Sequence, residues 1–199
     1  MTIEPNEQEL LVRHRQGFIR KQVRAQGKKG LLIVHTGDGK GKSTAAWGMV
    51  LRCLGHGKRV GVIQFIKGAL ASAERDFLQA SGLCDFHVVG RGYTWNAESQ
   101  SENEQVAREG WQEALKLLAD ETYAMVVLDE LNVVLKYRYL EVGDVLEALN
   151  TRRPGLHVVV TGRHAPEELI EAADLVTEMK SIKHPYRSQG IRAQAGIEF

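Results

Sequence analysis

The chain has 199 residues, of which 43% are hydrophobic and 26% are charged, and its formal net charge is +1. These values are typical of a single soluble globular domain, and they exclude a uniformly basic nucleic-acid coat protein and an acidic solvating protein. The charge is uneven, because residues 1–30 carry seven bases and three acids, whereas residues 31–199 carry 19 bases and 22 acids. We therefore predict a basic N-terminal arm, 1–30, attached to a mildly acidic domain, 31–199.

Apolar runs rich in β-branched residues alternate with amphipathic stretches along residues 31–199. The runs lack strict alternation of polar and apolar residues, which is typical of strands buried on both faces. The predicted strands are 31–35, 60–66, 86–89, 125–128, 157–161 and 175–182. The predicted helices are 43–54, 99–119, 142–150 and 166–173. This order favours an α/β fold with a mainly parallel β-sheet and helices on both faces.

The first predicted helix is Ala-rich and amphipathic. Its large apolar side chains fall together at helical spacing, so we expect one buried face made of Trp47, Val50, Leu51 and Leu54.

Two cysteines, Cys53 and Cys84, stand apart from any CxxC pair or Cys/His cluster. We therefore expect two reduced, buried thiols in a cytoplasmic protein, and neither a zinc site nor a disulfide. No run of 18 apolar residues is present, and the first residues lack the apolar segment of a secretory signal. The sequence thus predicts no membrane partner.

A glycine-rich segment at residues 36–44 follows the first predicted strand and precedes the Ala-rich helix. A P-loop occurs in this context, in which a strand is followed by a glycine-rich loop, the residues Gly-Lys-Ser/Thr and a helix. It binds phosphate through backbone N–H groups and the helix N-terminus. Lys42 is expected to reach phosphate oxygens and Ser43 to bind Mg²⁺, while Thr36 departs from the pattern's first glycine. Lys40 is either a further phosphate contact or a solvated lysine. The predicted ATP-binding residues are Thr36, Gly37, Asp38, Gly39, Lys40, Gly41, Lys42, Ser43 and Thr44.

Two carboxylates, Asp129 and Glu130, directly follow the apolar run 125–128. In P-loop proteins an acid at such a strand end reaches the Mg²⁺ beside the phosphate loop, because parallel strands end at the same edge. The alternative is that Asp129 caps the next helix. Together the two motifs predict a P-loop fold of the RecA-like NTPase type that binds a nucleoside triphosphate. Such a site could belong to an ATPase or a kinase. In an ATPase, Glu130 would polarise the attacking water.

The string at residues 37–46 resembles the phosphate loop of the ATP:cob(I)alamin (corrinoid) adenosyltransferase family with a P-loop fold. Further matching strings occur in order at 62–68, 92–95, 127–131, 161–163, 183–185 and 193–198. The resemblance covers nearly the whole chain, including the basic arm. It implies that Co(I) of cobalamin, or of a precursor such as cobyrinic acid a,c-diamide, attacks the 5′ carbon of ATP and that triphosphate leaves. No protein nucleophile is needed for this transfer.

The resemblance also implies roles for particular residues on the nucleotide side. Lys42 and Glu130 are expected to be catalytic, and Ser43, Asp129 and Glu130 are expected to hold Mg²⁺ or Mn²⁺. Arg52 matches a family position near the nucleotide, and a surface arginine is the alternative.

On the corrinoid side, the resemblance implies that Tyr93 and Trp95 line the lower face of the corrin. Tyr93 stands where phenylalanine is expected in the family. The alternative is that both are ordinary loop aromatics that pack on the core. The sequence also contains His87, His157, His164 and His184, which we interpret as structural residues rather than cobalt ligands.

The resemblance implies, finally, that the arm is a helical lid over the corrinoid, that the protein is a homodimer, and that a reductant such as a flavoprotein supplies Co(I). From its residues alone the arm is a marginal helix with a thin apolar stripe, and the alternative is a solvated tail. A nucleic-acid-binding ATPase that uses this arm is a further alternative, but the acidic charge of residues 31–199 argues against a nucleic-acid partner.

Overall fold

The computed structural model describes residues 12, 27–66, 73–89 and 100–197. The strands are β1 (Leu32–Thr36), β2 (Arg59–Gln64), β3 (Cys84–Val88), β4 (Tyr123–Asp129), β5 (His157–Thr161) and β6 (Leu175–Glu178). The helices are α2 (Lys42–Gly55), α3 (Ala73–Gln79), α4 (Gln100–Ala119), α5 (Leu131–Lys136), α6 (Val142–Asn150), α7 (Glu167–Ala172) and α8 (Pro185–Gln189).

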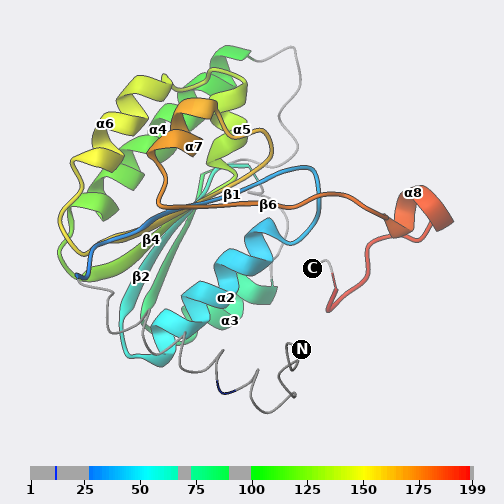
Figure 1. The fold of residues 1–199 in the computed structure, drawn as a ribbon, viewed down its shortest axis with the longest axis horizontal. Coiled ribbons are helices and arrows are strands. Elements are labelled where there is room, and N and C mark those ends of the chain that lie inside the picture. The colour runs from blue at the N-terminus through cyan, green and yellow to red at the C-terminus, as the bar shows by residue number, and fades with distance from the viewer. Residues whose placement is uncertain (1–11, 13–26, 67–72, 90–99, 198–199) are drawn as a thin grey trace, which may run out of the picture.

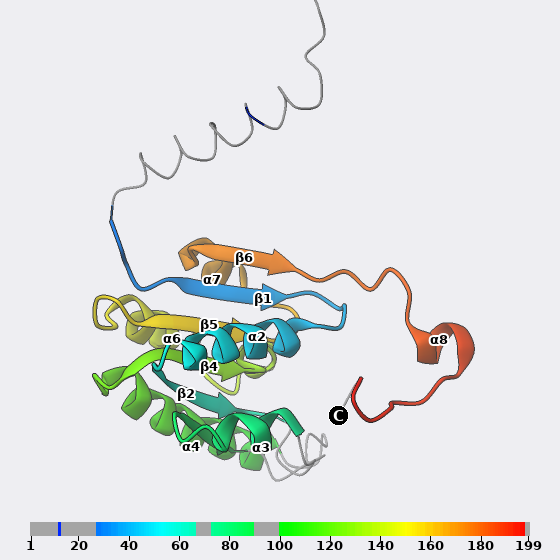
Figure 2. The same ribbon diagram turned by 90° about the horizontal axis from the view of Figure 1, so that it is seen from below.

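The strands form one sheet in the order β3-β2-β4-β5-β1-β6, and every pairing between them is parallel. Figure 1 shows α2 and α3 on one face of the sheet and α4, α5, α6 and α7 on the other. The predicted α/β fold, with a mainly parallel sheet and a P-loop, is therefore confirmed. In Figure 2 the labelled strand arrows point the same way, so their carboxyl ends meet at one edge.

Each face of the sheet carries its own core, because successive strand residues point to opposite faces. Ile33, Val62 and Val127 pack with Trp47 and Val50 of α2. Their strand neighbours Val34, Ile63 and Leu128 face the opposite side of the sheet. There they join a core with residues of α4, α5, α6 and α7, which include Trp111, Leu131, Leu149 and Leu169. Residues buried on both faces explain why the central strands show continuous apolar runs in the sequence.

The predicted buried face of the first helix is wrong at one position. Leu51 is 53% exposed, whereas Trp47, Val50 and Leu54 are buried. Leu51 follows Val50 by one residue, which turns it about 100° away from the sheet.

The last predicted strand, 175–182, is too long. β6 ends at Glu178, and all four of its residues are exposed because it lies at the edge of the sheet. Three short helices, α3, α5 and α8, were not predicted, since five to seven residues give too little periodicity to detect.

Both cysteines are free thiols, and the predicted burial is found for only one of them. Cys84 is buried and burial raises its pKa to about 11, whereas Cys53 is only partly buried. Within the described residues, no helix is long and apolar enough to cross a membrane.

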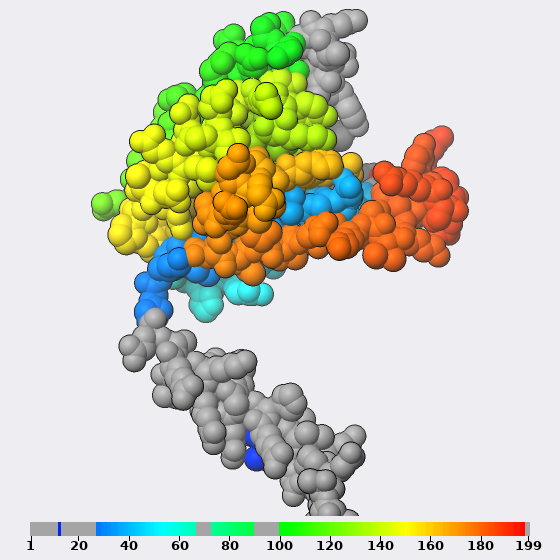
Figure 3. Space-filling view, turned by 45° about the horizontal axis from the view of Figure 1, so that its top comes forward, coloured from blue at the N-terminus to red at the C-terminus, as the bar shows by residue number. Residues whose placement is uncertain are grey.

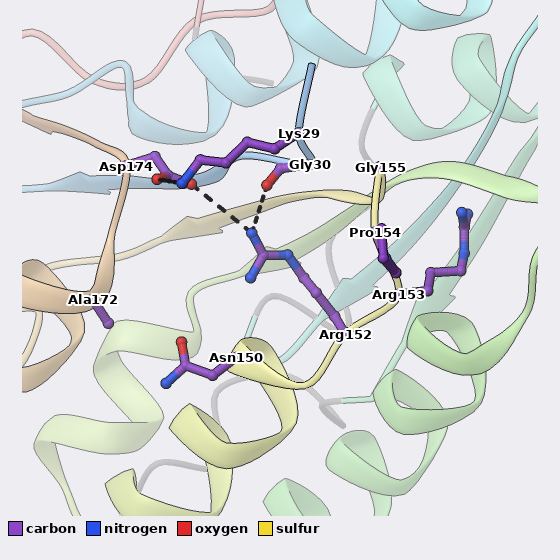
Figure 4. A pocket seen from close by; sticks show the side chains of 9 residues that line it. All are labelled: Lys29, Gly30, Asn150, Arg152, Arg153, Pro154, Gly155, Ala172 and Asp174. Atoms are coloured by element: carbon purple, nitrogen blue, oxygen red, sulfur yellow. Dashed lines mark hydrogen bonds and ion pairs between the residues drawn. The ribbon is translucent and has the colours of Figure 1, made fainter. Parts of the chain in front are cut away.

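The edge opposite the phosphate loop holds the chain segment that enters β1. Arg152 donates to Gly30 O at 2.8 Å, and Asp174 accepts a 3.0 Å hydrogen bond from Leu32 N and forms an ion pair with Lys29. Lys29, Gly30, Arg152 and Asp174 line a cavity of about 290 Å³ (Figure 4). The segment that links the N-terminal arm to β1 is therefore fixed at the amino edge of the sheet.

Candidate nucleotide site

The phosphate loop turns sharply between β1 and α2. Gly37 and Gly41 have φ values of 94° and 107°, a region that glycine adopts without steric cost. Gly41 caps the N-terminus of α2, so the backbone N–H groups of the first helical turn point toward the loop. The loop and helix end thus form a site suited to an anion.

Thr36 accounts for the departure from the usual P-loop pattern. It remains in β1, and its hydroxyl Oγ1 accepts a 3.0 Å hydrogen bond from the backbone N–H of Ala165, which lies before α7. The positive φ is found one residue later, at Gly37. A hydroxyl at position 36 therefore ties the loop to the β5–α7 connection, an interaction that glycine cannot make.

Lys42 is buried, with 7% of its surface exposed, and lies in the first turn of α2. Its Nζ donates to Gly37 O at 2.8 Å and to Gly39 O at 2.6 Å. A buried ammonium needs such partners, since an unpaired charge would be costly to bury. The loop carbonyls thus hold the Lys42 ammonium against the loop, where an anionic ligand would compete for it.

Asp129 is fully buried at the carboxyl end of β4. Its Oδ1 accepts a 2.7 Å hydrogen bond from the Thr161 hydroxyl, and its Oδ2 accepts a 2.8 Å hydrogen bond from Gln64 Nε2. The Thr161 oxygen in turn accepts from Glu130 N at 3.0 Å. Residues of the neighbouring strands β2 and β5 therefore orient the carboxylate. These contacts differ from those of the alternative, in which Asp129 caps the next helix.

These polar residues form a row across the sheet on the face covered by α2. The register pairs Gln64 with Asp129, and His35 with both Thr161 and Thr177. His35 is 6% exposed, and both its ring nitrogens are buried without a hydrogen-bond partner among the described residues. Burial lowers the pKa of His35, so the imidazole is neutral near pH 7. The row lies at the carboxyl ends of the strands, the edge at which the phosphate loop leaves β1.

Glu130 follows Asp129 and adopts the left-handed conformation, with φ of 63°. Non-glycine residues in this region cost of order 1–3 kcal/mol and are found at functional sites. Asn132 braces the turn, because its Nδ2 donates to His35 O at 3.2 Å and to Gly162 O at 2.9 Å. A Cβ at Gly162 would lie 2.9 Å from Asn132 Cβ, so this close approach requires glycine.

The oxygen donors at this edge fit a hard divalent cation. Ser43 supplies a hydroxyl in the first turn of α2, and Asp129 and Glu130 supply carboxylates at the end of β4. In the described part of the chain, no group of three or more His, Cys, Asp or Glu side chains could hold a metal by itself. This donor set suits Mg²⁺, which commonly takes one or two carboxylates together with substrate phosphates and water.

One predicted ATP-binding residue lies away from this edge, and three others are exposed at it. Arg52 is exposed in the last turn of α2, about 15 Å along the helix axis from Lys42 at 1.5 Å per residue. Asp38, Lys40 and Thr44 are exposed on the loop and the start of α2. The predicted corrinoid residues, Tyr93 and Trp95, lie outside the described residues, as does most of the N-terminal arm.

Sequence reasoning missed several residues that shape the site. Gln64 and Thr161 orient Asp129, and the signal for both was a polar side chain at the end of an otherwise apolar strand. His164, interpreted as structural, lies after β5 with its Nε2 3.6 Å from Asp38 Oδ1. Short-range spacing could not reveal these contacts, because they join strands distant in sequence.

The parallel sheet, the loop that begins at Thr36 and the oriented Asp129 define a P-loop nucleotide-binding protein. Comparison with known proteins is more specific. A profile of the family described as ATP:corrinoid adenosyltransferase BtuR/CobO/CobP matches residues 28–199. The chain belongs to this ATP:corrinoid adenosyltransferase family.

Several relatives are similar over most of their length. A corrinoid adenosyltransferase of a Sinorhizobium species is 49% identical over 175 residues, 86% of this chain and 81% of that protein. That of Pseudomonas aeruginosa is 46% identical over 195 residues, 94% of this chain and 96% of that protein. That of Escherichia coli K12 is 43% identical over 175 residues, 88% of each chain.

Solved structures show a weaker likeness. The flagellar accessory protein FlaH of Methanocaldococcus jannaschii gives a TM-score of 0.49 at 13% identity and covers 81% of this chain and 76% of its own. The RadB recombinase gives a TM-score of 0.48 at 16% identity. The match covers 84% of this chain and 82% of the recombinase chain.

Proposed function

We propose that the protein transfers the 5′-deoxyadenosyl group of ATP to the Co(I) centre of a corrinoid and releases triphosphate. The observation that carries this proposal is membership of the corrinoid adenosyltransferase family over residues 28–199. The phosphate loop and the oriented Asp129 at one sheet edge support the nucleotide half of the reaction.

In the proposed step, the electron pair of Co(I) forms the Co–C bond to the 5′ carbon. The C5′–O bond breaks, and its electron pair leaves on the triphosphate oxygen. Cobalt is thereby oxidised to Co(III), so no protein nucleophile or further oxidant is required. The protein is left with two tasks, positioning the reactants and stabilising the charge of the leaving group.

The chain stabilises the triphosphate with groups already present at the loop. The N-terminus of α2 and the loop amides offer hydrogen-bond donors, and Lys42 offers a positive charge. Lys42 now binds Gly37 O and Gly39 O, so phosphate oxygens would replace or share these acceptors. The binding residues we propose on this side are Thr36, Gly37, Asp38, Gly39, Lys40, Gly41, Lys42, Ser43, Thr44 and, on the outer end of α2, Arg52.

A divalent cation, Mg²⁺ or Mn²⁺, would be held by Ser43, Asp129 and Glu130. When bound, it supplies positive charge to the leaving triphosphate. Gln64 and Thr161 keep the Asp129 carboxylate oriented for this role through their hydrogen bonds.

For the corrinoid, we propose that Tyr93 and Trp95 line the lower face and that the basic arm, 1–30, acts as a lid. The chain enters β1 at the amino edge of the sheet, where Asp174 holds Lys29 and Leu32. The phosphate loop lies at the carboxyl ends of the strands. An arm that covers it as a lid must therefore extend along the length of the sheet from the amino ends of the strands. We also propose a cytoplasmic homodimer whose corrinoid is reduced by a protein such as a flavoprotein.

The products of ATP distinguish this reaction from an ATPase or kinase reaction. We expect triphosphate in the phosphorus NMR spectrum when ATP is incubated with reduced corrinoid, and unchanged ATP without it. Lys42→Ala should lower the rate of triphosphate release by about a hundredfold or more, because a charge at the leaving group is lost. ADP and phosphate formed without corrinoid would contradict the proposal and favour the ATPase alternative.

A further inference from the structure

The chain just beyond β6 pairs with the phosphate loop. Met179 N donates a 2.8 Å hydrogen bond to Thr36 O, and Gly39 N donates a 2.6 Å hydrogen bond to Met179 O. The β1–β6 register ends with Thr36 beside Glu178, so these two bonds continue the parallel ladder past the end of β1. The loop is thus joined to the edge strand.

This contact also explains the glycines of the loop. A Cβ added at Gly37 would lie 2.5 Å from Met179 O, and one at Gly39 would lie 2.7 Å from the same oxygen. At Gly41 the nearest atom would be Met179 Sδ, at 3.3 Å. Gly39 has no positive φ, so close approach of the Met179 backbone, rather than its own conformation, requires glycine there.

Met179 is linked to the loop's lysine through a single residue. Gly39 donates its N–H to Met179 O and accepts the Lys42 Nζ hydrogen bond on its own carbonyl, at 2.6 Å in each case. We propose that Met179 is a positioning residue, which fixes the loop so that Lys42 and the loop amides are arranged for the triphosphate of ATP. This inference rests on the proposed function for its substrate and goes beyond it by assigning a residue outside the P-loop motif.

The edge strand that precedes Met179, β6, has little packing of its own. All four β6 residues are exposed, and the chain after Met179 projects from the body as the orange and red end of Figure 3. Segments with few buried apolar contacts open locally at low free-energy cost. Opening of β6 would remove both backbone bonds to the loop, so ATP affinity depends on the docking of this segment.

The first test uses the unmodified protein without ATP. Hydrogen exchange of the Gly39 amide, followed by NMR, should be slow because its N–H is bonded to Met179 O. Exchange at the rate of an unstructured chain would overturn the proposal.

The second test compares ATP affinity among variants by calorimetry. Met179→Pro removes the N–H that bonds to Thr36 O and should weaken ATP binding about tenfold, the effect of one lost hydrogen bond. Met179→Leu keeps the backbone and the side-chain bulk, so its affinity should stay within about twofold of the wild type. Val176→Ala is the matched control in β6, and it should also stay within about twofold because its side chain lies away from the loop.

Equal weakening by Val176→Ala and Met179→Pro would show general loosening of the edge strand and would overturn a specific role for Met179. ATP affinity is measured without corrinoid. The positioning role of Met179 and the proposed adenosyl transfer can therefore be contradicted independently of each other. A wild-type protein that binds ATP, loses affinity on Met179→Pro and yet forms no adenosylcorrinoid would support the positioning role and contradict the proposed function.

Discussion

Thr161 and Asp129 lie side by side at the carboxyl ends of β5 and β4, joined by a 2.7 Å hydrogen bond from the hydroxyl to the carboxylate. The same Thr161 oxygen accepts from Glu130 N, next to Asp129 in sequence. One hydroxyl thus fixes both the buried carboxylate and the backbone of the second acid. The phosphate-loop side of the sheet is therefore organised by a strand that carries neither P-loop motif.

Thr161→Val keeps the shape of this side chain and removes its hydroxyl. Asp129 would lose a donor and Glu130 N an acceptor, both at least partly buried, so the free energy of unfolding should fall by about 1–3 kcal/mol. We expect kcat/KM for ATP to fall about tenfold. Thr177→Val, in the same row but exposed on β6, should change stability by about 0.5 kcal/mol or less. Equal effects from both variants would argue against the role of Thr161.

Thr36 offers a test of the altered P-loop pattern. Thr36→Val removes the acceptor for Ala165 N, whereas Thr36→Ser retains it. We expect the valine variant to lose about 1–2 kcal/mol in chemical denaturation and to bind ATP more weakly, with the serine variant near the wild type. If serine and valine behave alike, the hydroxyl is not what ties the loop to α7.

Stability should depend on pH through the buried His35 and the partly buried His157. Burial lowers the pKa of His35 and of His157, whose Nδ1 accepts a hydrogen bond from Leu31 N. The unfolded chain therefore binds protons more readily than the folded chain, so the histidine contribution is full above about pH 6.5 and is lost as pH falls below that value.

Denaturant midpoints measured from pH 7.5 to pH 5 should therefore decrease, and His35→Phe should make that decrease shallower. A His35→Phe variant with the same pH dependence as the wild type would show that His35 does not contribute.

Removal of the basic arm tests the proposed lid. A chain lacking residues 1–28 should show a raised KM for the corrinoid with little change in ATP affinity, because the phosphate loop lies in the remaining domain. The two constants can be measured in parallel by steady-state kinetics and calorimetry. An equal weakening of corrinoid use and of ATP binding, or no change in either, would count against a corrinoid lid.

The sequence was sufficient to predict the strands that are buried on both faces, because these appear as continuous apolar runs. Strands such as β4 are apolar on both faces and end in Asp129, so both their existence and their functional end were predictable. Leu51 and the exposed β6 were misjudged because an apolar residue at a surface edge has the same local signal as a buried one.

The site was predictable only where its residues are adjacent in the chain. Lys42 and Ser43 belong to one motif, and its spacing alone predicted them as site residues. The partners of Asp129 come from β2 and β5, and Met179 reaches Gly39 from 140 residues away. Such contacts are set by the strand order β2-β4-β5-β1-β6, which no local pattern encodes.

We propose above all that the protein forms a carbon–cobalt bond from ATP. The most direct measurement is the visible spectrum of chemically reduced cob(I)alamin incubated anaerobically with the protein, ATP and Mg²⁺. We expect conversion to the spectrum of adenosylcobalamin, with one triphosphate released for each corrinoid converted. Persistence of the cob(I)alamin spectrum with no triphosphate, from a protein that binds ATP, would contradict it.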